Sequence, residues 1–355
     1  MPNPKLVDVN LFVHNGASTI AAALDSVLAQ TWPALAITVI DNASNDATSD
    51  IVAAYAARDS RITLLRNRAN TGPVMNCQRA FWSGDADFVM PKTADDLLAP
   101  EFVAEVMALL CAHPDVAMCH AAGLVFDDSG AVISVYPPEH RLDAVGPDPL
   151  ERARHVMARY TSAPSFWGIY RRAAVDRLAT IPYRAGWDHA VMAELALYGE
   201  IRSVDAVLFW RRHGGKDVGL LARGCSQYSQ RGLDLRDAMS DLRWRTPLVT
   251  TAYAHVEQFA VARLDAPRRR TLMGDVPRIF RARWLPMMLQ EAARFDAALP
   301  ALLDVLAAES GVAAQWAARH LLDALTALDT MLPEQSFGAA RVDVAAFAEG
   351  LRLAA

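Results

Sequence analysis

The chain has 355 residues, of which 53% are hydrophobic and 21% are charged. This balance excludes a disordered chain, and 18 glycines and 19 prolines are too few for a collagen-like or low-complexity one. With 35 basic and 40 acidic residues the net charge is −5, which argues against nucleic acid as a partner. The length favours one enlarged domain, or one domain with an appended one.

The four cysteines argue against both a disulfide framework and a zinc site. They are widely spaced and form no CxxC pair: Cys77, Cys111, Cys119 and Cys225. The first ten residues lack the basic and apolar regions of a secretory signal. The longest uncharged stretches, 9–24 and 26–40, fall short of a bilayer span. From these features we expect a protein of the reducing cytoplasm.

Short apolar runs alternate with helical patterns through the first hundred residues. Strands are predicted at 7–13, 36–40, 62–65 and 88–90, and helices from Ser18, after Asp46 and over 74–82. Strands separated by helices of this length pair in parallel through right-handed crossovers, with helices on both faces. The pattern predicts an open α/β sheet whose ligands lie beyond the carboxyl ends of its strands.

The middle of the chain adds further strands before its character changes. A strand pair is predicted at 116–126 and 131–136, and a proline-rich loop then leads into a helix. Strands at 165–170 and 204–210 flank a helix over 187–198. After about Gly219 the sequence consists of long Ala/Leu/Arg stretches with helical spacing. We therefore divide the chain into an α/β domain, 1–220, and an α-helical extension, 221–355.

Polar turns follow three of the predicted strands, at 13–16, 41–46 and 93–96. In an open parallel sheet these turns meet at one rim. Asn, Asp and Ser are common in turns for local hydrogen bonding, and we expect Ser44 and Asp46 to cap the helix that follows them. The Asp95-Asp96 pair is different, because carboxylates beside a nucleotide suit Mg²⁺ or Mn²⁺, which bridge diphosphate oxygens.

Over roughly residues 5–215 the sequence resembles family 2 glycosyltransferases with the GT-A fold. Residues 7–52 carry the strand, the polar turn, an S-x-x-x-Q helix with Ser26 and Gln30, and the D-N-x-S-x-D-x-T turn. The run ADFVMPKTADDLLAPEF resembles the family's DxDD segment, and GWDHAVMAELALYGEIRSVDAVLFWRRHGG resembles its catalytic helix and R-x-H strand. The resemblance implies an open mixed sheet flanked by helices, with the α-helical extension following it.

The resemblance also implies roles for individual residues. Contacts with the donor nucleotide are expected from Phe12, His14, Asn15, Asp41, Gly72, Lys92 and Thr93. Asp95, Asp96 and His213 are expected to hold Mn²⁺ or Mg²⁺. Asp188 corresponds to the base that takes the acceptor proton, and Gly168 and Trp187 are expected on the acceptor side. The first turn of a helix keeps a carboxylate such as Asp188 ionised.

The chain has three lysines, Lys5, Lys92 and Lys216. Two of them, Lys92 and Lys216, flank the expected site. A compact ammonium group suits a phosphate or a sugar hydroxyl, which is why Lys92 is included among the donor contacts.

The sequence departs from the family pattern at two positions. Thr93 replaces the first acidic residue of the DxD motif, and Trp187 stands where an acidic neighbour of the base is usual. A threonine hydroxyl is expected to hold a ribose less tightly than a carboxylate, because charge-assisted hydrogen bonds are stronger than neutral ones.

The resemblance implies an inverting, metal-dependent transferase that moves a sugar from a nucleotide diphosphate sugar to a hydroxyl of a glycan, lipid-linked or protein acceptor. Surface-glycan or glycoconjugate assembly is the expected setting. One alternative is a nucleotidyltransferase, which should carry a Gly-rich, basic phosphate loop where this chain has residues 15–18. Another is a catalytically silent protein that binds sugar nucleotides, for which Thr93 is the support.

The extension contains a basic segment, 263–283, with seven arginines and two aspartates. It suggests either a peripheral contact with the anionic inner face of a membrane or a solvated arginine face on a helical bundle, and the second is favoured. The Ala/Leu-rich helices that follow fit packing on the core or a homodimer partner equally well.

Overall fold

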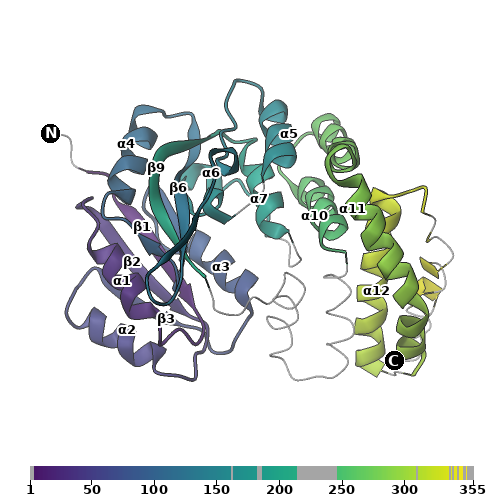
Figure 1. The fold of residues 1–355 in the computed structure, drawn as a ribbon, viewed down its shortest axis with the longest axis horizontal. Helices are drawn as coiled ribbons and strands as arrows, with labels where there is room; N and C mark the ends of the chain where they lie inside the picture. Colours follow the sequence, from purple (N-terminus) through teal and green to yellow (C-terminus); the bar gives the residue numbers. More distant parts are fainter. Residues whose placement is uncertain are drawn as a thin grey trace. The chain divides into compact units, whose positions relative to one another are not determined.

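A computed structural model of the chain describes residues 4–160, 163–181, 186–213, 246–308 and most of 311–349. The chain divides into two compact units, described here one at a time (Figure 1). The first comprises Met1–Ile181 and Met192–Asp217, and the second Pro182–Val191 and Val218–Ala355. The boundary expected at residue 220 lies outside the described residues and stays a prediction.

The first unit is built on a nine-stranded sheet with the order β3-β2-β1-β4-β8-β6-β9-β5, and β7 pairs with β6. The strands are β1 Val7–Val13, β2 Leu35–Asp41, β3 Ile62–Arg66, β4 Phe88–Thr93, β5 Leu97–Leu98, β6 Val116–Phe126, β7 Val132–Val135, β8 Gly168–Arg171 and β9 Glu200–Arg212. The alternation of apolar runs and helical patterns thus correctly predicts β1 to β4 and β6 to β9 in order, but not the short strand β5 or the helix Phe102–Ala112.

The pairing directions define two opposite edges of this sheet. β1 pairs in parallel with β2 and β4, and β2 with β3. β8 runs antiparallel to both β4 and β6, so β6 has the same direction as β4, and β9 is parallel to β6. The carboxyl ends of β1, β2 and β4 therefore lie on one edge, and the amino ends of β6 and β9 on the other. The expected open mixed sheet is confirmed.

Helices cover both faces of the sheet. The helices along residues 20–195 are α1 Ile20–Leu28, α2 Thr48–Ala56, α3 Pro73–Trp82, α4 Phe102–Ala112, α5 Pro149–Arg159, α6 Arg172–Val175 and α7 Trp187–Leu195, with 3₁₀ turns at Pro138–His140 and Ala163–Ser165. Helices α1, α2 and α4 lie on one side and α3 on the other (Figure 1). Ile20, Val52 and Phe102 bring the first three helices into one apolar cluster with Val9 and Leu11.

Gln30 of the S-x-x-x-Q pattern ties α1 to the segment after the acidic turn. Its side-chain amide donates to the carbonyls of Ser26 and Ala99, at 2.9 and 2.8 Å, and its oxygen accepts from the N–H of Val103 at 2.9 Å. This buried side chain is fully used within the protein. The motif residue therefore positions the acidic turn rather than contacting a ligand.

A buried ion pair between Asp8 and Arg172 joins the start of β1 to the residue after β8. Arg172 Nη2 lies 2.9 Å from Asp8 Oδ2. The remaining guanidinium contacts are with the carbonyls of Phe81, Ser83 and Ala86. A Cβ atom at Gly84, whose φ is +79°, would lie 2.2 Å from the same Asp8 oxygen, so only glycine fits there.

Two predicted elements end earlier or begin later than expected. The strand expected from 165 begins only at Gly168, because residues 163–165 form a 3₁₀ turn. The helix expected to reach 198 ends at Leu195, because the N–H groups of Leu197 and Tyr198 turn back to carbonyls three residues earlier. Conversely, β9 begins at Glu200 rather than 204 and runs on to Arg212.

The second unit contains α10 Pro247–Val261, α11 Ala266–Ala308 and α12 Gly311–Met331. The α-helical character expected for the extension is confirmed in these segments. Glu291 of α11 accepts the N–H groups of Leu248 and Val249 at 3.0 to 3.1 Å, which supplies partners for two of the unsatisfied donors at the start of α10. Burial raises the pKa of Glu291 to about 7.

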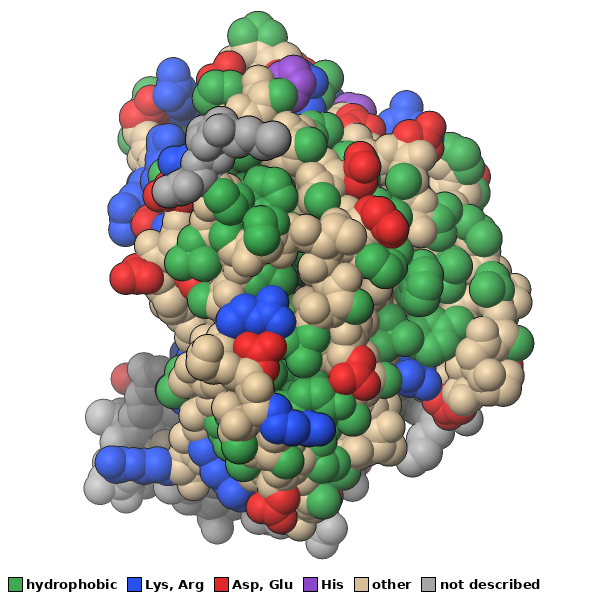
Figure 2. Space-filling view, turned by 90° about the vertical axis from the view of Figure 1, so that its left-hand side faces the viewer, with side chains coloured by type: hydrophobic (Ala, Val, Ile, Leu, Met, Phe, Trp, Pro, Cys, Tyr) green, Lys and Arg blue, Asp and Glu red, His purple; other side chains and the backbone are tan. Residues whose placement is uncertain are grey.

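Several arginines of the basic segment are neutralised within the second unit. Arg268, Arg278 and Arg281 form ion pairs with Asp265, Asp275 and Glu334. These pairs reduce the positive charge that is available to an anionic surface, and contact with a membrane stays a prediction. Within the described residues, no helix is both long and apolar enough to cross a bilayer. In the first unit, the face shown in Figure 2 has acidic and basic side chains interspersed.

His255 makes the second unit sensitive to acid. It is 1% exposed, and burial among side chains that include Phe280 lowers its pKa from the usual 6.5 to about 3. Between these two pH values His255 therefore binds more protons in the unfolded chain than in the folded one. The free energy of unfolding is thus highest above pH 6.5 and decreases as the pH drops. We expect a loss of about 2 kcal/mol between pH 7 and pH 5 from this one residue.

Urea unfolding at pH 7 and pH 5 checks this expectation. The variant His255→Phe, which cannot titrate, should lose measurably less stability between the two pH values than the wild type. Equal losses in the two proteins would show that His255 is not the group responsible.

Candidate active site

The turns after β1 and β2 are joined by hydrogen bonds that use successive backbone groups. The N–H groups of Asn15, Gly16 and Ala17 donate to Ser44 Oγ, Thr48 Oγ1 and Asp46 Oδ2 at 2.9, 2.9 and 3.1 Å. The expected capping by Ser44 is wrong, because its hydroxyl holds the first turn. Asp46 does accept the N–H of Thr48, at 3.0 Å. The two turns therefore form one rigid rim.

His14 and Asn15 reinforce this rim from the β1 side. The half-buried His14 ring places Nδ1 3.0 Å from the carbonyl oxygen of Asn42. Asn15 has a positive φ of 53° and accepts the N–H of Asn45 through its side chain at 2.9 Å. The structure places both residues at the expected rim, and their contacts with a nucleotide stay predictions.

Asp41 is fully buried at the end of β2 and organises the turn that follows. Its carboxylate accepts the N–H of Ser44 at 2.8 Å and the hydroxyl of Ser49, and Arg66 Nε lies 3.6 Å away. Burial disfavours its charged form, but these hydrogen bonds and the guanidinium outweigh that effect and hold the pKa of Asp41 below its usual value. The direct base or ribose contact expected of Asp41 is not supported by this burial.

An asparagine network that the sequence analysis missed holds the loop before α3 against the rim. Asn42 donates to Asn70 Oδ1 at 2.8 Å and accepts from Asn67 Nδ2 at 2.8 Å. Asn76 in α3 donates to the carbonyls that end β1 and β2. Gly72, with φ +85°, lies in this loop, and its carbonyl accepts from Asn42 at 3.3 Å. The signal in the sequence was the recurrence of asparagine between residues 42 and 76.

Asp96 fastens the end of β4 to the end of β9. It is 4% exposed, and its two oxygens accept from the Thr93 hydroxyl at 2.7 Å and the Arg212 N–H at 3.0 Å. The ammonium of Lys92 is 1% exposed and donates to the carbonyls of Thr93 and Asp96. Lys92 is therefore turned into the protein, and the expectation that it contacts a donor phosphate is corrected.

Burial shifts the pKa values of both Asp96 and Lys92. It raises the pKa of Asp96 to about 6, assisted by the negative charge of Asp95. It lowers the pKa of Lys92 to about 8, an effect that the two aspartates oppose. Each group is stabilised in its charged form by the other, because an isolated charge in such a place would be lost.

Asp95 differs from its neighbour because its side chain is exposed at the rim. Arg212 Nε donates to the backbone carbonyl of Asp95, at 3.1 Å. The N–H of His213 donates to the Phe126 carbonyl at 2.7 Å. Among the described residues, no three His, Cys, Asp or Glu side chains are close enough to hold a metal. The expected trio of Asp95, Asp96 and His213 is thus not assembled, and both Asp96 oxygens are already in use.

Aromatic side chains lie beside the rim. The half-buried rings of Phe12 and Trp167 are 5.9 Å apart, and Phe12 is in register with Thr93. Trp167 was not among the expected site residues. Its neighbour Gly168 lies in β8, where a Cβ would come within 2.3 Å of the Cys119 carbonyl. Sheet packing thus accounts for this glycine.

Trp187 and Asp188 begin α7 and are half-buried. Asp188 occupies the first turn, where the helix dipole favours a carboxylate. Both residues belong to the second unit, so their roles at the rim of the first unit stay predictions.

Comparison with known proteins supports the expected family. Residues 9–172 match the family model of glycosyl transferase family 2. Over this part of its length the chain is similar to family 2 glycosyltransferases. The match covers β1 to β8, including the turns after β1 and β2 and the acidic turn after β4. The expected resemblance is confirmed.

Curated relatives of this chain are named as glycosyltransferases, and solved structures share its fold. The chain is 29% identical over 125 residues to the putative glycosyltransferase EpsE of Bacillus subtilis, covering 35% of this chain and 45% of that protein. It is 25% identical over 193 residues to the uncharacterized glycosyltransferase YibD of Escherichia coli, covering 53% and 55%. The chain thus spans about half the length of these relatives. S. aureus TarS 1–349 in complex with UDP shares the fold, with a TM-score of 0.56, 15% identity, and coverage of 99% and 92%.

The two neighbouring aspartates should respond differently to mutation. Asp96→Ala leaves the buried Lys92 ammonium without a counter-charge, so we expect it to lower the free energy of unfolding by about 3 kcal/mol or more. Asp95→Ala removes an exposed side chain and should leave the urea midpoint unchanged. Equal effects of the two substitutions on the midpoint would contradict this division.

Proposed function

We propose that this chain is an inverting, metal-dependent glycosyltransferase that moves a sugar from a nucleotide diphosphate sugar to an acceptor hydroxyl. The similarity to family 2 glycosyltransferases supports this function. So does the fold shared with TarS, which has been crystallised with UDP and with UDP-GlcNAc. The proposed acceptor is a glycan, a lipid-linked sugar or a protein, in surface-glycan or glycoconjugate assembly.

The observation that carries the proposal is the exposed carboxylate of Asp95 in the turn after β4. Asp96, Lys92 and Thr93 bond to one another and to Arg212, which leaves Asp95 free to face a ligand. A magnesium-type ion beneath a diphosphate needs only one or two protein carboxylates, because phosphate oxygens and water complete its shell. The donor set therefore fits Mg²⁺ or Mn²⁺ bound together with the nucleotide, with Asp95 as the protein ligand.

The proposed chemistry divides between the two halves of the donor–acceptor pair. Asp188 would take the proton of the acceptor hydroxyl as that oxygen attacks the sugar carbon from the face opposite the diphosphate. When bound, the cation would neutralise the charge that develops on the departing diphosphate. Asp95 would hold that cation at the rim, and Phe12 and Trp167 would offer apolar surface to a sugar ring.

The rim does not favour a nucleotidyltransferase. That chemistry calls for a loop whose free backbone N–H groups cradle phosphates. Here the N–H groups of Asn15, Gly16 and Ala17 are all bonded to side chains of the neighbouring turn. A catalytically silent binding protein is distinguished by assay, since it would bind sugar nucleotides without hydrolysing or transferring them. Hydrolysis of a panel of sugar nucleotides, followed by transfer assays on the donor so identified, tests the function.

Metal removal should abolish transfer, and Mn²⁺ or Mg²⁺ should restore it. We expect Asp95→Ala to weaken binding of a nucleoside diphosphate at least tenfold while leaving nucleoside binding unchanged, because only the diphosphate shares the cation. Calorimetric titration of both ligands, with and without metal, measures this. Full transfer activity in chelator would overturn the proposed metal dependence.

Replacing the proposed base should separate binding from catalysis. Asp188→Asn keeps the shape of the side chain but cannot accept the proton, so we expect turnover to fall by about two to four orders of magnitude with donor affinity unchanged. Single-turnover transfer and donor titration on the same preparation give both quantities. The assignment fails if the variant retains most of its transfer rate.

A further inference from the structure

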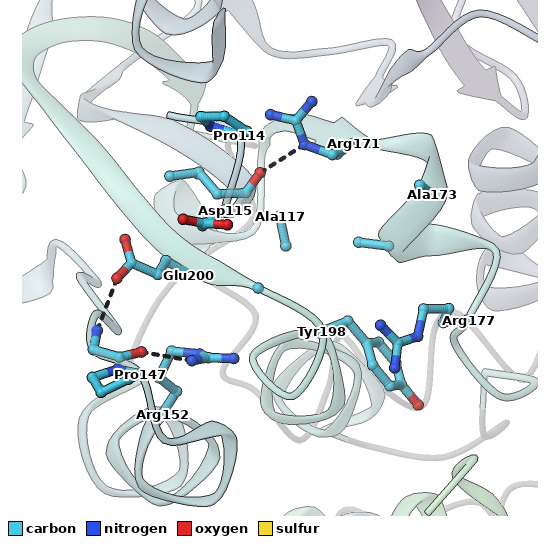
Figure 3. Close-up of a pocket in the computed structure, with 14 residues that line it drawn as sticks. Pro114, Asp115, Ala117, Pro147, Arg152, Arg171, Ala173, Arg177, Tyr198 and Glu200 are labelled. Carbon is cyan, nitrogen blue, oxygen red and sulfur yellow. Dashed lines mark hydrogen bonds between the residues drawn. The ribbon is translucent and has the colours of Figure 1, made fainter. Parts of the chain in front are cut away.

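A cavity of about 660 Å³ opens in the first unit at the sheet edge opposite the rim (Figure 3). Its walls come from the amino ends of β6 and β9, the end of β8 with α6, and the start of α5. Its volume lies within the roughly 300–1,000 Å³ typical of small-molecule sites. A lone inorganic ion would leave most of such a space unfilled.

The cavity is remote from the proposed donor site. It lies at Val116 and Glu200, where β6 and β9 begin, whereas Arg212 pairs with Phe126 at the far end of both strands. β6 has 11 residues, and at a rise of about 3.3 Å per residue it separates the two places by roughly 30 Å. A ligand of this cavity would therefore not touch the proposed donor.

A buried guanidinium with unused donors lines the cavity. Arg152 of α5 is 7% exposed, and its Nε and Nη1 donate to the carbonyls of Ala196 and Gly146 at 2.8 and 2.6 Å. These bonds fix its plane. In the described structure Nη2 has no hydrogen-bonding partner, and none of the ion pairs found involves Arg152, so part of a buried cation remains available to a ligand. The two hydrogens of the fixed Nη2 can be donated to the oxygens of a phosphate or carboxylate.

Two more arginines line the same cavity from other elements. Arg171, at the end of β8, uses Nε and Nη2 on backbone carbonyls of residues 110–116. The guanidinium carbon of Arg177 lies 4.3 Å from the centroid of the Tyr198 ring, over its face. The hydroxyl of Tyr198 is bonded to Glu194 at 2.8 Å, which holds the ring in place. Figure 3 shows Arg177 beside Tyr198 and Arg152 on a different wall.

Two carboxylates on the same side of the cavity supply acceptors. Glu200 accepts the N–H of Gly146 at 2.9 Å and pairs with Arg202 at 2.8 Å, contacts that lower its pKa and keep it charged. Asp115 is exposed, and its side chain lies on the same side of the cavity as Glu200 in Figure 3. Charged oxygens of this kind suit the hydroxyl groups of a polyol and disfavour a ligand that is anionic throughout.

We propose that this cavity is a second binding site for a phosphate ester of a sugar or polyol. The guanidinium groups of Arg152 and Arg177 donate hydrogen bonds to the phosphate, and Asp115 and Glu200 accept hydrogen bonds from the hydroxyl groups. The Tyr198 ring packs against the apolar face of the carbon skeleton. The site is independent of the proposed transferase activity, because it lies at the other edge of the sheet.

Calorimetric titration of glucose 6-phosphate into the full chain, with UDP present and absent, tests the proposal. We expect binding that UDP does not displace, no binding of glucose, and binding of inorganic phosphate at least tenfold weaker than that of the ester. Arg177→Gln, which changes an exposed side chain, should weaken binding of the ester about tenfold. Arg152→Lys, which keeps the charge but loses the fixed Nη2 donor, should also weaken it.

Arg58→Gln is the matched control, because Arg58 is likewise exposed and lies 4.7 Å over the ring of Tyr55, in α2. It should bind the ester as the wild type does. The proposal is overturned if the ester does not bind at millimolar concentration, if UDP displaces it, or if phosphate alone binds equally well. It is also overturned if Arg177→Gln and Arg152→Lys both bind the ester normally.

Discussion

The contact of Asp96 with Thr93 and Arg212 is the interaction on which the proposed active site depends. It joins two strand ends that are 116 residues apart in sequence, and the Lys92 ammonium supplies the charge that keeps the buried carboxylate ionised. Burying this pair is costly, and it is tolerated because every strong donor and acceptor in it has a partner. The result is a turn whose backbone is fixed while one carboxylate, Asp95, is left at the surface.

The fold was largely predictable because its signals are local. Apolar runs of three to seven residues between helical patterns specify β1 to β4, and parallel pairing follows from the connections. The elements whose bounds were misjudged include β8 and the end of α7, which are set by turns at 163–165 and 195–198 whose hydrogen bonds depend on the surrounding structure. Hydrophobic pattern alone does not record such bonds.

The candidate site was predictable in place but less so in detail. The sequence indicated which turns meet, and His14, Asn15 and Asp95 do lie at that rim. It did not indicate which polar side chains point inward. Lys92 and Asp41 look like ligand-binding residues by position, yet burial and their own partners turn them into structural groups. Distinguishing the two cases requires knowing the environment on every side of a residue, which one-dimensional spacing does not contain.

The contact between Gly84 and Asp8 has a consequence for altering this protein. Position 84 has no room for even a methyl group, because Asp8 and its partner Arg172 occupy that space. By contrast, a Cβ at Gly274 in α11 would meet no atom within 4 Å. A chemist seeking a position for a fluorescent label or a surface tether would therefore avoid the loop before β4 and choose the exposed side of α11.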